Sequence, residues 1–580
     1  MAEAAGPGPT HPIVLYPETP LVVEDYDPAW ATHADRLIGL VRADRPDIEI
    51  HHIGSTSVPG LLAKPVIDLG ILAEPAAIPG IVEHLLGLGF QAQGGVFPFP
   101  PTRPLLLGGL RLADGSAIKI HLHVMPTVGR FQHDLRRHLV FRDTLRADPA
   151  LRDAYADVKR GIVGSGVTNT LSYSLNKTEF IRGVLERAGE GDLPLPPGST
   201  VGIIGGGQLG RMLGIAALQL GYRVVVLDPD PACPAAAIAD RVIVAAYDDV
   251  AAAGELADAS DVVTYELEHI SPDLVRRIDA DRPVHPVEYA LRMTQDRLAE
   301  RRFLVSVGAP VAPWREVRTL DDLRDGIDQL GYPARLKAAV GGYDGRSQVR
   351  IAFGADLEAA FGSLAGAASS VGLVLERELD FACECSSIVA RDGSGRAVAF
   401  PIARNLHDEG ILVESIAPAP APVTDAVVKE AQALAARLAM ELDLVGTLTV
   451  ELFLLADGSL VVNELAPRVH NSGHWTIEGA TTSQFEQHIR ALVGLPLGSP
   501  DPRGVTAMVN LLGAGHRRLA VLAGLDRALA DPGVHLHLYD KRDVFERRKM
   551  GHITVVDDDA KAAIHRARAA LAELHWTEGS

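Results

Sequence analysis

The chain has 580 residues, 47% of them hydrophobic and 22% charged, which is the composition of a globular protein and, at this length, predicts about four domains. Its formal net charge of −19 argues against broad surfaces for nucleic acids or anionic membranes, so phosphate-bearing ligands must meet local clusters of arginine and lysine. Three cysteines without CxxC spacing and the lack of an apolar run near ~20 residues predict a cytoplasmic protein without disulfides or membrane spans.

The N-terminal third begins with about 20 residues rich in proline and glycine, which are predicted to be disordered. Helical periodicity follows over residues 28–41, and residues 48–53 and 66–72 have the pattern of strands. The alternation over residues 118–124 places Lys119, His121 and His123 on one face of a further strand. Helices are expected from about residue 134 to residue 182.

The turn Gly54-Ser55 and the strand carboxylate Asp68 have the layout of a nucleotidyltransferase-like site, where the turn meets phosphate and strand acids hold a metal. Residues 21–188 resemble the GrpB-like family of that fold through H-I-G-S-T-S-V-P-G-L-L-A-K-P-V-I-D, H-L-H-V and F-R-D-T-L-R. The usual second acid is replaced by Gly70, and His121 and His123 stand where a third acid is expected. Three roles therefore stay open: catalysis, binding of a nucleotide or partner, and metal binding by the two histidines.

Residues 189–199 contain G-D-L-P-L-P-P-G and predict a linker between domains. Beyond it, the strand 201–204 leads into Gly205-Gly206-Gly207-Gln208-Leu209-Gly210, which opens a helix, and residues 224–228 form the next strand. This matches the dinucleotide fingerprint, with Asp228 about 20 residues on. NAD is one interpretation; another phosphorylated ligand is the favoured one, because a helix N-terminus serves either and no substrate domain for an NAD enzyme is evident.

Two acids, Glu266 and Glu268, lie at the carboxyl end of the strand expected over residues 261–268, where open α/β sheets bind ligands. Farther on, the strand 333–337 ends in Lys337, and a glycine-rich turn over residues 341–348 leads to a strand over 349–352. Such a tip can close over phosphates through its backbone N–H groups and Lys337; a plain hairpin is the alternative. The strand 371–376 can offer backbone groups to an adenine edge.

Asp457-Gly458 between two apolar strands predicts a hairpin with these residues at the turn centre. Counting outward pairs Ala456 with Ser459, Phe453 with Val462, and Glu451 with Glu464. Because β-carbons of opposed residues lie ~4.5–5.5 Å apart, two carboxylates there favour a divalent cation, Mg²⁺, between them. A solvated hairpin with two surface glutamates is the alternative.

The run N-E-L-A-P-R-V-H-N-S-G-H-W-T over residues 463–476 carries more hydrogen-bonding groups than a loop needs, which indicates a ligand site. It resembles the signature of the ATP-grasp 5-(carboxyamino)imidazole ribonucleotide synthase family of purine biosynthesis, as do G-G-G-Q-L-G-R-M-L, G-G-Y-D-G-R, N-x-H and R-K-M-G-H. With the N-terminal domain, this resemblance over residues 199–575 implies an α/β and α+β multidomain protein. Its parts are a Rossmann-like pre-ATP-grasp domain (200–295), an ATP-grasp domain (296–495) and a C-terminal domain that completes the substrate site (496–575).

The resemblance also implies a set of residues for each ligand. For ATP the set is Arg292, Lys337, Gly342, Tyr343, Asp344, Gly345, Arg346, Ser347, Gln348, Glu376, Arg377, Glu378, Leu379, Glu384, His407, Asn463 and Glu464. For the ribonucleotide it is Gln208, Leu209, Glu266 (with Glu268 as the alternative), Tyr343, Arg468, His470, Asn471, Ser472, Lys541 and Arg548. Glu451 and Glu464 are assigned the metal, and Asp344, Lys541 and Arg548 catalytic roles, with Asp344 accepting the amine proton. Asp540 replaces a family glycine, which leaves that loop's conformation open.

The implied reaction is carboxylation of 5-aminoimidazole ribonucleotide by bicarbonate through carboxyphosphate, with ATP and Mg²⁺ as cofactors, in a homodimer that binds neither nucleic acid nor membrane. A formate-using glycinamide ribonucleotide transformylase is the closest rival, but its run usually reads R-P-H-D-T-G. An inactive nucleotide-binding scaffold is the alternative from another class, and the intact Lys337, Glu451 and Glu464 argue against it.

Overall fold

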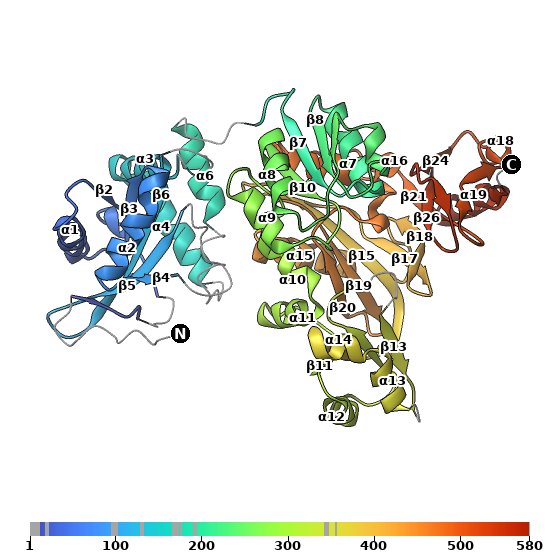
Figure 1. Cartoon of the computed structure of the whole chain (residues 1–580), viewed down its shortest axis with the longest axis horizontal. Coiled ribbons are helices and arrows are strands. Elements are labelled where there is room, and N and C mark those ends of the chain that lie inside the picture. Colours follow the sequence, from blue (N-terminus) through green and yellow to red (C-terminus); the bar gives the residue numbers. More distant parts are fainter. Residues whose placement is uncertain are drawn as a thin grey trace. The chain divides into compact units, whose positions relative to one another are not determined.

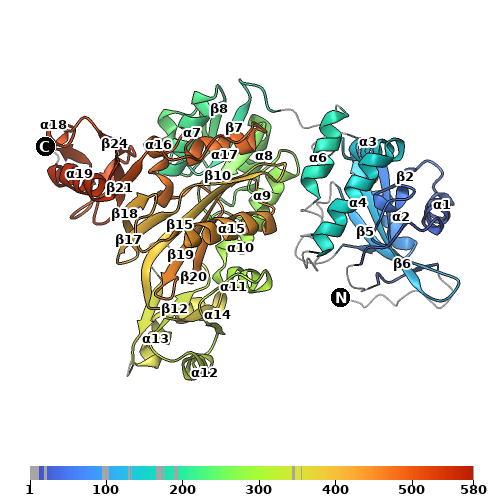
Figure 2. The same ribbon diagram turned by 180° about the vertical axis from the view of Figure 1, so that it is seen from behind.

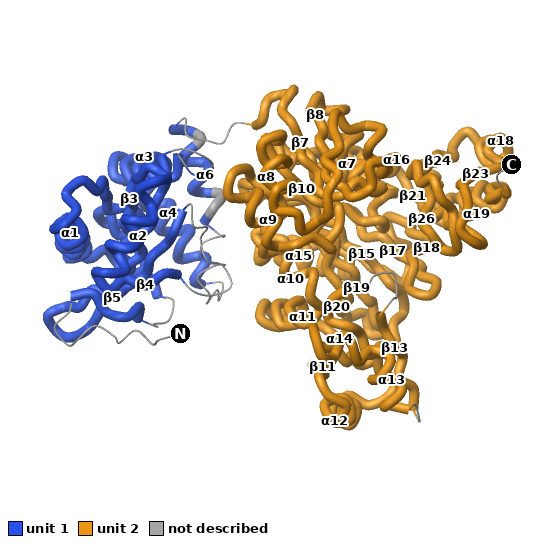
Figure 3. The backbone as a smooth tube through the Cα atoms, viewed as in Figure 1, with its two compact units in different colours: residues 1–193 blue, residues 194–580 orange. Residues whose placement is uncertain are grey.

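The computed structural model describes residues 12–17, 22–93, 103–127, 131, 133–164, 173, 177–188, 194–341, 347–353 and 356–578. The chain divides into two compact units, residues 1–193 and 194–580, shown in different colours in Figure 3. Most of the predicted N-terminal tail, half of the predicted linker and the glycine-rich residues 342–346 lie outside the described residues. Among the described helices, none is both long and apolar enough to cross a membrane.

Unit 1 is built on a six-stranded sheet in the order β1–β5–β6–β3–β2, with β4 beside β5 (Figure 1). The strands are β1 (Ile13–Val14), β2 (Glu49–Ile53), β3 (Val66–Ala73), β4 (Gln91–Ala92), β5 (Leu105–Arg111) and β6 (Ala117–Pro126). The helices are α1 (Ala29–Arg42), α2 (Ile78–Gly87), α3 (Asp134–Ala147), α4 (Pro149–Gly164) and α6 (Thr178–Arg187). Only the pair β3 and β6 is parallel among the described strands of this sheet.

The two faces of this sheet differ in polarity. Ile67, Leu69 and Ile71 of β3 pack with α1 and α2 in one buried cluster. The alternation predicted for β6 is confirmed: Ile118, Ile120 and Leu122 are buried, whereas Lys119, His121 and His123 are partly exposed. Asp68 of β3 is also partly exposed, so the polar side chains share the face away from α1 and α2.

Unit 2 begins with a parallel four-stranded sheet in the order β10–β7–β8–β9. Its strands are β7 (Thr200–Ile204), β8 (Arg223–Leu227), β9 (Arg241–Ile243) and β10 (Val262–Tyr265), and its helices are α7 (Gln208–Gln219), α8 (Val250–Ala259) and α9 (Pro272–Asp279). Strands β7, β8 and β10 are almost fully buried because helices cover the sheet (Figure 2), whereas the edge strand β9 buries only Ile243. This is the open α/β arrangement expected for the pre-ATP-grasp part.

Two antiparallel sheets form the middle of unit 2. The smaller has the order β11–β14–β12–β13, with β11 (Trp314–Val317), β12 (Ala334–Ala338), β13 (Gln348–Ile351) and β14 (Leu373–Arg377). The nine-stranded sheet runs β20–β19–β15–β17–β18–β21–β26–β24, with β16 beside β15. Its strands are β15 (Phe381–Arg391), β16 (Ala397–Ala399), β17 (Ala403–Asp408), β18 (Ile411–Ala417), β19 (Gly446–Leu455), β20 (Leu460–Ala466), β21 (Val505–Leu512), β24 (Val534–Leu538) and β26 (Lys549–Asp557).

The remaining elements pack on these sheets. The helices are α10 (Glu288–Gln295), α11 (Arg297–Ser306), α12 (Leu320–Leu330), α13 (Leu357–Ser363), α14 (Ala365–Ser370), α15 (Asp425–Glu441), α16 (Thr476–Gly479), α17 (Gln484–Leu492), α18 (Leu525–Ala528) and α19 (Ala560–Glu573). Four short strands pair as β22 (Arg518–Leu519) with β25 (Asp543–Val544) and β23 (Val521–Ala523) with β27 (His575–Thr577). α15 buries Leu434 and Leu438 against β15 and β19.

The β19–β20 hairpin corrects the register predicted from the sequence. Leu455 N donates to Ser459 O at 2.9 Å, so the loop holds three residues, and Phe453 pairs with Val461 instead of Val462. A bulge at Asn463 then shifts the register back by one residue, so Glu451 does pair with Glu464. The predicted two-residue turn was therefore wrong, and the predicted carboxylate pair is confirmed because the bulge offsets the longer loop.

Candidate active site

A cavity of about 610 Å³ opens between the small antiparallel sheet and the nine-stranded sheet of unit 2. The predicted residues that line it come from eight separate stretches of chain. They are Lys337, Gln348, Glu376, Arg377, Glu378, Leu379, Glu384, His407, Glu451, Asn463, Glu464, His470 and Asn471. The cavity therefore gathers most of the described residues that the sequence assigned to ATP.

Glu376 is the centre of the charges at the cavity wall. Its side chain is only 7% exposed; Oε1 lies 2.6 Å from Nε of Arg301, and Oε2 lies 2.7 Å from Nζ of Lys337. Burial alone would raise the pKa of Glu376, but Arg301 and Lys337 together lower it to about 2. The carboxylate is therefore ionised at neutral pH and fixes the lysine ammonium inside the cavity.

Glu300 and Arg301 belong to this network, and the sequence reasoning missed both. Both are buried in α11, where Arg301 contacts Oε1 of Glu300 at 3.3 Å and also donates to the backbone carbonyl of Asn463. The N–H of Leu465 donates to Oε1 of Glu300 at 3.0 Å, and burial raises the pKa of Glu300 to about 8. The available signal was Arg301 at helical spacing between Leu298 and Leu304, a charge on the apolar side of a helix.

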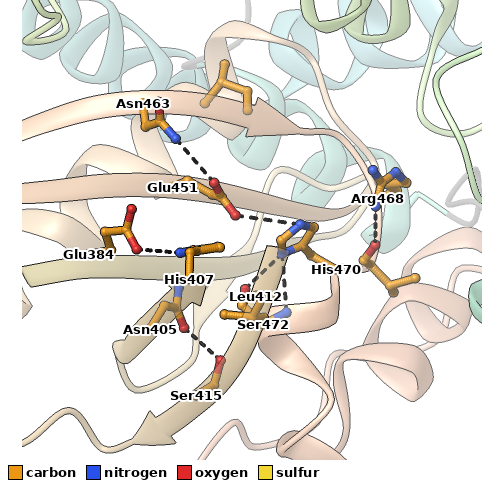
Figure 4. A network of polar contacts seen from close by, with 12 residues as sticks. Glu384, Asn405, His407, Leu412, Ser415, Glu451, Asn463, Arg468, His470 and Ser472 are labelled. Carbon is orange, nitrogen blue, oxygen red and sulfur yellow. Dashed lines mark hydrogen bonds and ion pairs between the residues drawn. The ribbon is translucent and has the colours of Figure 1, made fainter. Parts of the chain in front are cut away.

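The carboxylates of Glu451 and Glu464 face the same cavity from adjacent strands. Nδ2 of Asn463 donates to Oε2 of Glu451 at 3.4 Å, and Nε2 of His470 lies 3.6 Å from its Oε1 (Figure 4). Burial, and then the neighbouring charge of Glu464, raise the pKa of Glu451. A bound cation would relieve this repulsion, so the pair has the chemistry of a site for a hard divalent metal.

The tautomer of His470 follows from its neighbours. The backbone N–H of Ser472 donates to Nδ1 of His470 at 3.3 Å, so Nδ1 accepts and the ring proton of the neutral imidazole is on Nε2, toward Glu451. Burial lowers the pKa of His470 well below its usual value, which keeps the ring neutral. His470 therefore turns its Nε2–H toward Glu451 at 3.6 Å, just beyond hydrogen-bond distance, without adding a full charge.

Glu384 and His407 form a second acid–base pair on the cavity wall. Nδ1 of His407 on β17 contacts Oε2 of Glu384 on β15 (Figure 4). Burial would lower the pKa of His407, but Glu384 and Glu451 raise it above its usual value. Asn405, two residues before His407, is buried and accepts a 2.7 Å hydrogen bond from Oγ of Ser415, so its amide oxygen is engaged inside the sheet.

The glycine-rich turn before α7 is filled by an acid of the chain itself. The N–H groups of Gly207 and Gly210 donate to the two oxygens of Glu266 at 2.5 and 2.7 Å. Asp228 accepts from the N–H of Gly206 and from the Tyr247 hydroxyl, both at 2.7 Å. The groups that the NAD interpretation reserves for pyrophosphate and ribose are thus occupied, which argues against that interpretation and equally against a phosphate of the favoured ligand at the same N–H groups.

Glu268 lies apart from Glu266 and binds Arg468 in a bidentate pair, with contacts of 2.8 and 2.9 Å. Gln208 and Leu209 begin α7 beside the filled turn. The structure therefore gives the two acids different partners: Glu266 holds the turn, and Glu268 orients the arginine that the sequence assigned to the ribonucleotide.

Other predicted residues lie outside the cavity lining. Nζ of Lys541 donates to Lys549 O at 2.8 Å and Arg548 donates to Asp543 O at 2.6 Å, while Arg292 pairs with Glu288. Lys549 of the R-K-M-G-H run lines the cavity, although the sequence assigned it to neither the ATP set nor the ribonucleotide set. Ser347 and Ser472 are described without lining the cavity, and Gly342, Tyr343, Asp344, Gly345 and Arg346 lie outside the described residues.

In the loop that contains Lys541, the residue that replaces the family glycine adopts a left-handed backbone conformation. Asp540 has φ 59°, in the left-handed region, which aspartate adopts more readily than most residues. Its Oδ2 lies 3.4 Å from Nη1 of Arg211 on α7. The substitution of the family glycine is therefore compatible with a left-handed turn.

Family models match four stretches of the chain. Residues 199–295 match the ribonucleotide synthetase preATP-grasp domain, residues 302–485 the ATP-grasp domain, and residues 506–566 the phosphoribosylaminoimidazole carboxylase C-terminal domain. Residues 20–187 match the GrpB protein model. The chain thus combines a GrpB domain with pre-ATP-grasp, ATP-grasp and carboxylase C-terminal domains.

Whole relatives match unit 2. An N5-carboxyaminoimidazole ribonucleotide synthase of Brucella melitensis is 44% identical over 360 residues, which are 62% of this chain and 97% of the relative. One of Bacillus subtilis is 43% identical over 358 residues, or 62% of this chain and 91% of the relative. A crystal structure of the Aspergillus clavatus synthase with ADP and 5-aminoimidazole ribonucleotide is 32% identical, has a TM-score of 0.58, and covers 65% of this chain and 98% of its own.

Proposed function

The chain belongs to the N5-carboxyaminoimidazole ribonucleotide synthase family, and we propose that its residues 194–580 carboxylate 5-aminoimidazole ribonucleotide with bicarbonate and ATP, as a ligase of purine biosynthesis. A bicarbonate oxygen accepts the γ-phosphoryl group of ATP, which yields ADP and carboxyphosphate. The exocyclic amine of the ribonucleotide then bonds to the carboxyl carbon, the carbon–oxygen bond to phosphate breaks, and the amine loses a proton.

One observation carries this proposal: a single cavity holds Lys337 and Glu376 from one sheet together with Glu451 and Glu464 from another. Lys337 would meet phosphate oxygens, and the backbone of Glu376 to Leu379 would meet the adenine edge. Glu384 would accept from the ribose hydroxyls, with His407 fixing its orientation. We propose that the other residues of the ATP set predicted from the sequence also contact the nucleotide.

Mg²⁺ fits the Glu451–Glu464 pair because two carboxylates lie opposite each other without a side chain between them in the register. When bound there, it would neutralise the phosphate oxygens during phosphoryl transfer. The amide of Asn463 and the Nε2–H side of His470 would steady Glu451.

The ribonucleotide would be held by the chain's own cations and polar groups around the signature run. This set is Gln208, Leu209, Glu266, Arg468, His470, Asn471, Ser472, Lys541 and Arg548, together with Tyr343, which lies outside the described residues. Asp344, outside the described residues, stays our candidate to accept the amine proton. Lys541 and Arg548 would offset charge on the departing phosphate.

The deciding experiment measures ADP release by the full chain with ATP and Mg²⁺, alone and with each substrate combination. We expect turnover to require both 5-aminoimidazole ribonucleotide and bicarbonate. Turnover with glycinamide ribonucleotide and formate would favour the transformylase instead. ATP binding without turnover under any condition would favour a scaffold.

Two further properties remain part of the proposal. We propose a homodimer, which light scattering behind size-exclusion chromatography would test by its mass. We also propose a cytoplasmic location on the composition of the chain, which fractionation of the native host would test.

A further inference from the structure

Unit 1 contains a cluster of metal-ligating side chains that the carboxylation reaction does not use. Asp68, His121 and His123 each offer one ligand atom, and these atoms all lie within 4.8 Å of one another. The parallel pairing of β3 and β6 creates the cluster, because Asp68 stands beside His121 and Gly70 beside His123 in the register. Asp68 and His121 are 25% and 19% exposed, so an ion can reach the cluster from solvent.

We propose that Asp68, His121 and His123 bind a divalent transition-metal ion, with Zn²⁺ preferred over Mg²⁺. Two imidazoles and one carboxylate are ligands of Zn²⁺ and its first-row neighbours, whereas Mg²⁺ prefers an all-oxygen shell. Three protein ligands leave at least one coordination position for water or an exogenous ligand. The site therefore differs in kind from the two-carboxylate pair of unit 2.

The surroundings of His121 match those of a metal ligand. Its Nδ1 faces Asp68, 3.2 Å from Oδ1, while its Nε2 lies 2.8 Å from the Tyr16 hydroxyl. A ligating histidine usually donates its other ring N–H to a fixed acceptor, which selects the tautomer and the ring orientation. With Nδ1 on the metal, the Nε2–H would donate to Tyr16, and the side chain would be oriented before the ion arrives.

The packing at Gly70 explains why a histidine of the adjacent strand β6 completes the cluster. A β-carbon on Gly70 would lie 2.7 Å from Cδ1 of Leu135 and 3.2 Å from Cδ1 of Ile53. A second acid two residues after Asp68 therefore has no room, because α3 fills that space. His123 of β6 pairs with Gly70 of β3 in the register and supplies the third ligand.

Positive charge next to the cluster indicates what would take the open position. Lys64 and Lys177 lie over the same Tyr173 ring, 4.9 and 4.5 Å from its centroid, and Nζ of Lys159 donates to Oγ of Ser55 at 2.7 Å. Burial, and then Lys64, lower the pKa of Lys177 to about 7, so these ammonium groups are costly to keep together. An anion would offset that cost.

The turn at Gly54 brings this positive cluster close to Asp68. Gly54 has φ +70°, and a β-carbon there would lie 2.3 Å from Oδ2 of Asp68, so only glycine lets the turn approach the carboxylate. Ser55, the partner of Lys159, is the next residue. We therefore expect the open metal position to accept an oxygen of a small anion such as inorganic phosphate.

The test of the metal site is calorimetric titration of the EDTA-treated full chain with Zn²⁺ in excess Mg²⁺, which saturates the unit 2 pair. We expect binding near a single equivalent, weakened at least about 100-fold by Asp68→Asn and by His121→Gln. His51→Gln is the matched control, because Nε2 of His51 also contacts a carboxylate, at 2.9 Å from Oε1 of Glu49. His51 belongs to no metal-ligating group among the described residues.

Two further measurements test the metal site independently of any single variant. Circular dichroism without Zn²⁺ checks that each variant is folded, and the absorption spectrum of Co²⁺ bound to the wild-type chain reports imidazole ligation directly. No Zn²⁺ uptake by the wild type, a Co²⁺ spectrum of an all-oxygen site, or unchanged binding in folded Asp68→Asn would overturn the site. Binding that disappears in Glu464→Gln would assign the ion to unit 2 instead.

The anion is tested on the Co²⁺-loaded chain by adding inorganic phosphate. We expect the absorption band to shift, and Lys64→Ala to weaken this response about tenfold while Co²⁺ still binds. Lys561→Ala, an exposed lysine in the first turn of α19, is the control. A spectrum that ignores phosphate would overturn the anion assignment and leave the metal site in place.

Discussion

Nζ of Lys337 lies 2.7 Å from Oε2 of Glu376, across the adjacent strands β12 and β14. In the register Lys337 pairs with Val374, so Glu376 reaches it diagonally from two residues along the neighbouring strand. Arg301 holds the other oxygen of the same carboxylate at 2.6 Å. The lysine proposed to meet ATP phosphates is thus positioned before nucleotide binds, which reduces the entropy lost on binding.

Glu376→Gln should lower stability at neutral pH, because two buried cations lose their shared counter-charge. The pKa of Glu376 is lowered to about 2, so the ionised carboxylate contributes stability above its usual pKa of about 4.3, on the order of 3 kcal/mol. That contribution is lost as the pH falls from about 4.3 toward 2. Thermal unfolding of the wild type and Glu376→Gln should therefore differ most near pH 7 and converge only as the pH approaches about 2.

Glu378→Gln is the matched control for this measurement. It lies two residues away, but its carboxylate is 20% exposed and pairs with Arg335 and Arg350 at 2.9 and 2.6 Å. Such half-exposed pairs contribute about 1 kcal/mol or less. Equal losses for the two variants, or a Glu376→Gln difference that does not shrink in acid, would contradict the central role of Glu376.

Glu464→Gln should reduce carboxylation by on the order of 100-fold or more while the protein stays folded, because one of the two proposed Mg²⁺ ligands loses its charge. The measurement is initial rate against Mg²⁺ concentration, with loss of turnover in the wild type when Mg²⁺ is removed. Glu430→Gln, an exposed position on α15, controls for the loss of one negative charge. Near wild-type turnover at saturating Mg²⁺ would falsify the metal assignment.

Lys541→Ala and Arg548→Ala should weaken the binding of 5-aminoimidazole ribonucleotide and leave ATP affinity nearly unchanged. We expect this because neither side chain lines the cavity proposed for ATP. Each should cost about 2 kcal/mol, or roughly 30-fold in KM for the ribonucleotide. Titration of both ligands checks it, with the exposed neighbour Arg542→Ala as control. The opposite result, a weaker affinity for ATP with an unchanged affinity for the ribonucleotide, would mean that the two sites are exchanged.

A chain that begins at Pro194 should fold and keep carboxylation within about tenfold of the full chain, roughly 1.4 kcal/mol. The predicted linker extends to residue 199, but the structure ties its second half to unit 2. Leu195 N donates to Val493 O, and the Tyr222 hydroxyl donates to Leu195 O, both at 2.8 Å. A chain that begins at Gly198 should therefore have a free energy of unfolding about 1–2 kcal/mol lower than a chain that begins at Pro194.

Urea unfolding of the two truncated chains, together with their carboxylation rates, checks this prediction. Equal stability would mean that the contacts of Leu195 contribute little. A soluble Pro194 chain with its rate reduced more than tenfold would mean that unit 1 contributes to the activity of unit 2.

The amino-acid sequence alone determined the chemistry of unit 2, because the motifs that carry it are contiguous. Residues 463–476 and the strand ending at Lys337 could be recognised without knowing what they contact. Alternation along residues 118–124 likewise predicted the shared face of His121 and His123, since side-chain direction along a strand has a period of two.

The tertiary structure decided what depends on residues far apart in the chain. The sequence count placed Glu451 opposite Glu464 through a turn one residue too short, and only the bulge at Asn463 made the pairing correct. Arg301 joined the site because α11 packs against strands more than 70 residues away, a contact that no local pattern encodes. Asp68 met the histidines for the same reason: parallel pairing of β3 and β6 sets which side chains are neighbours, and a long crossover hides that register from the sequence.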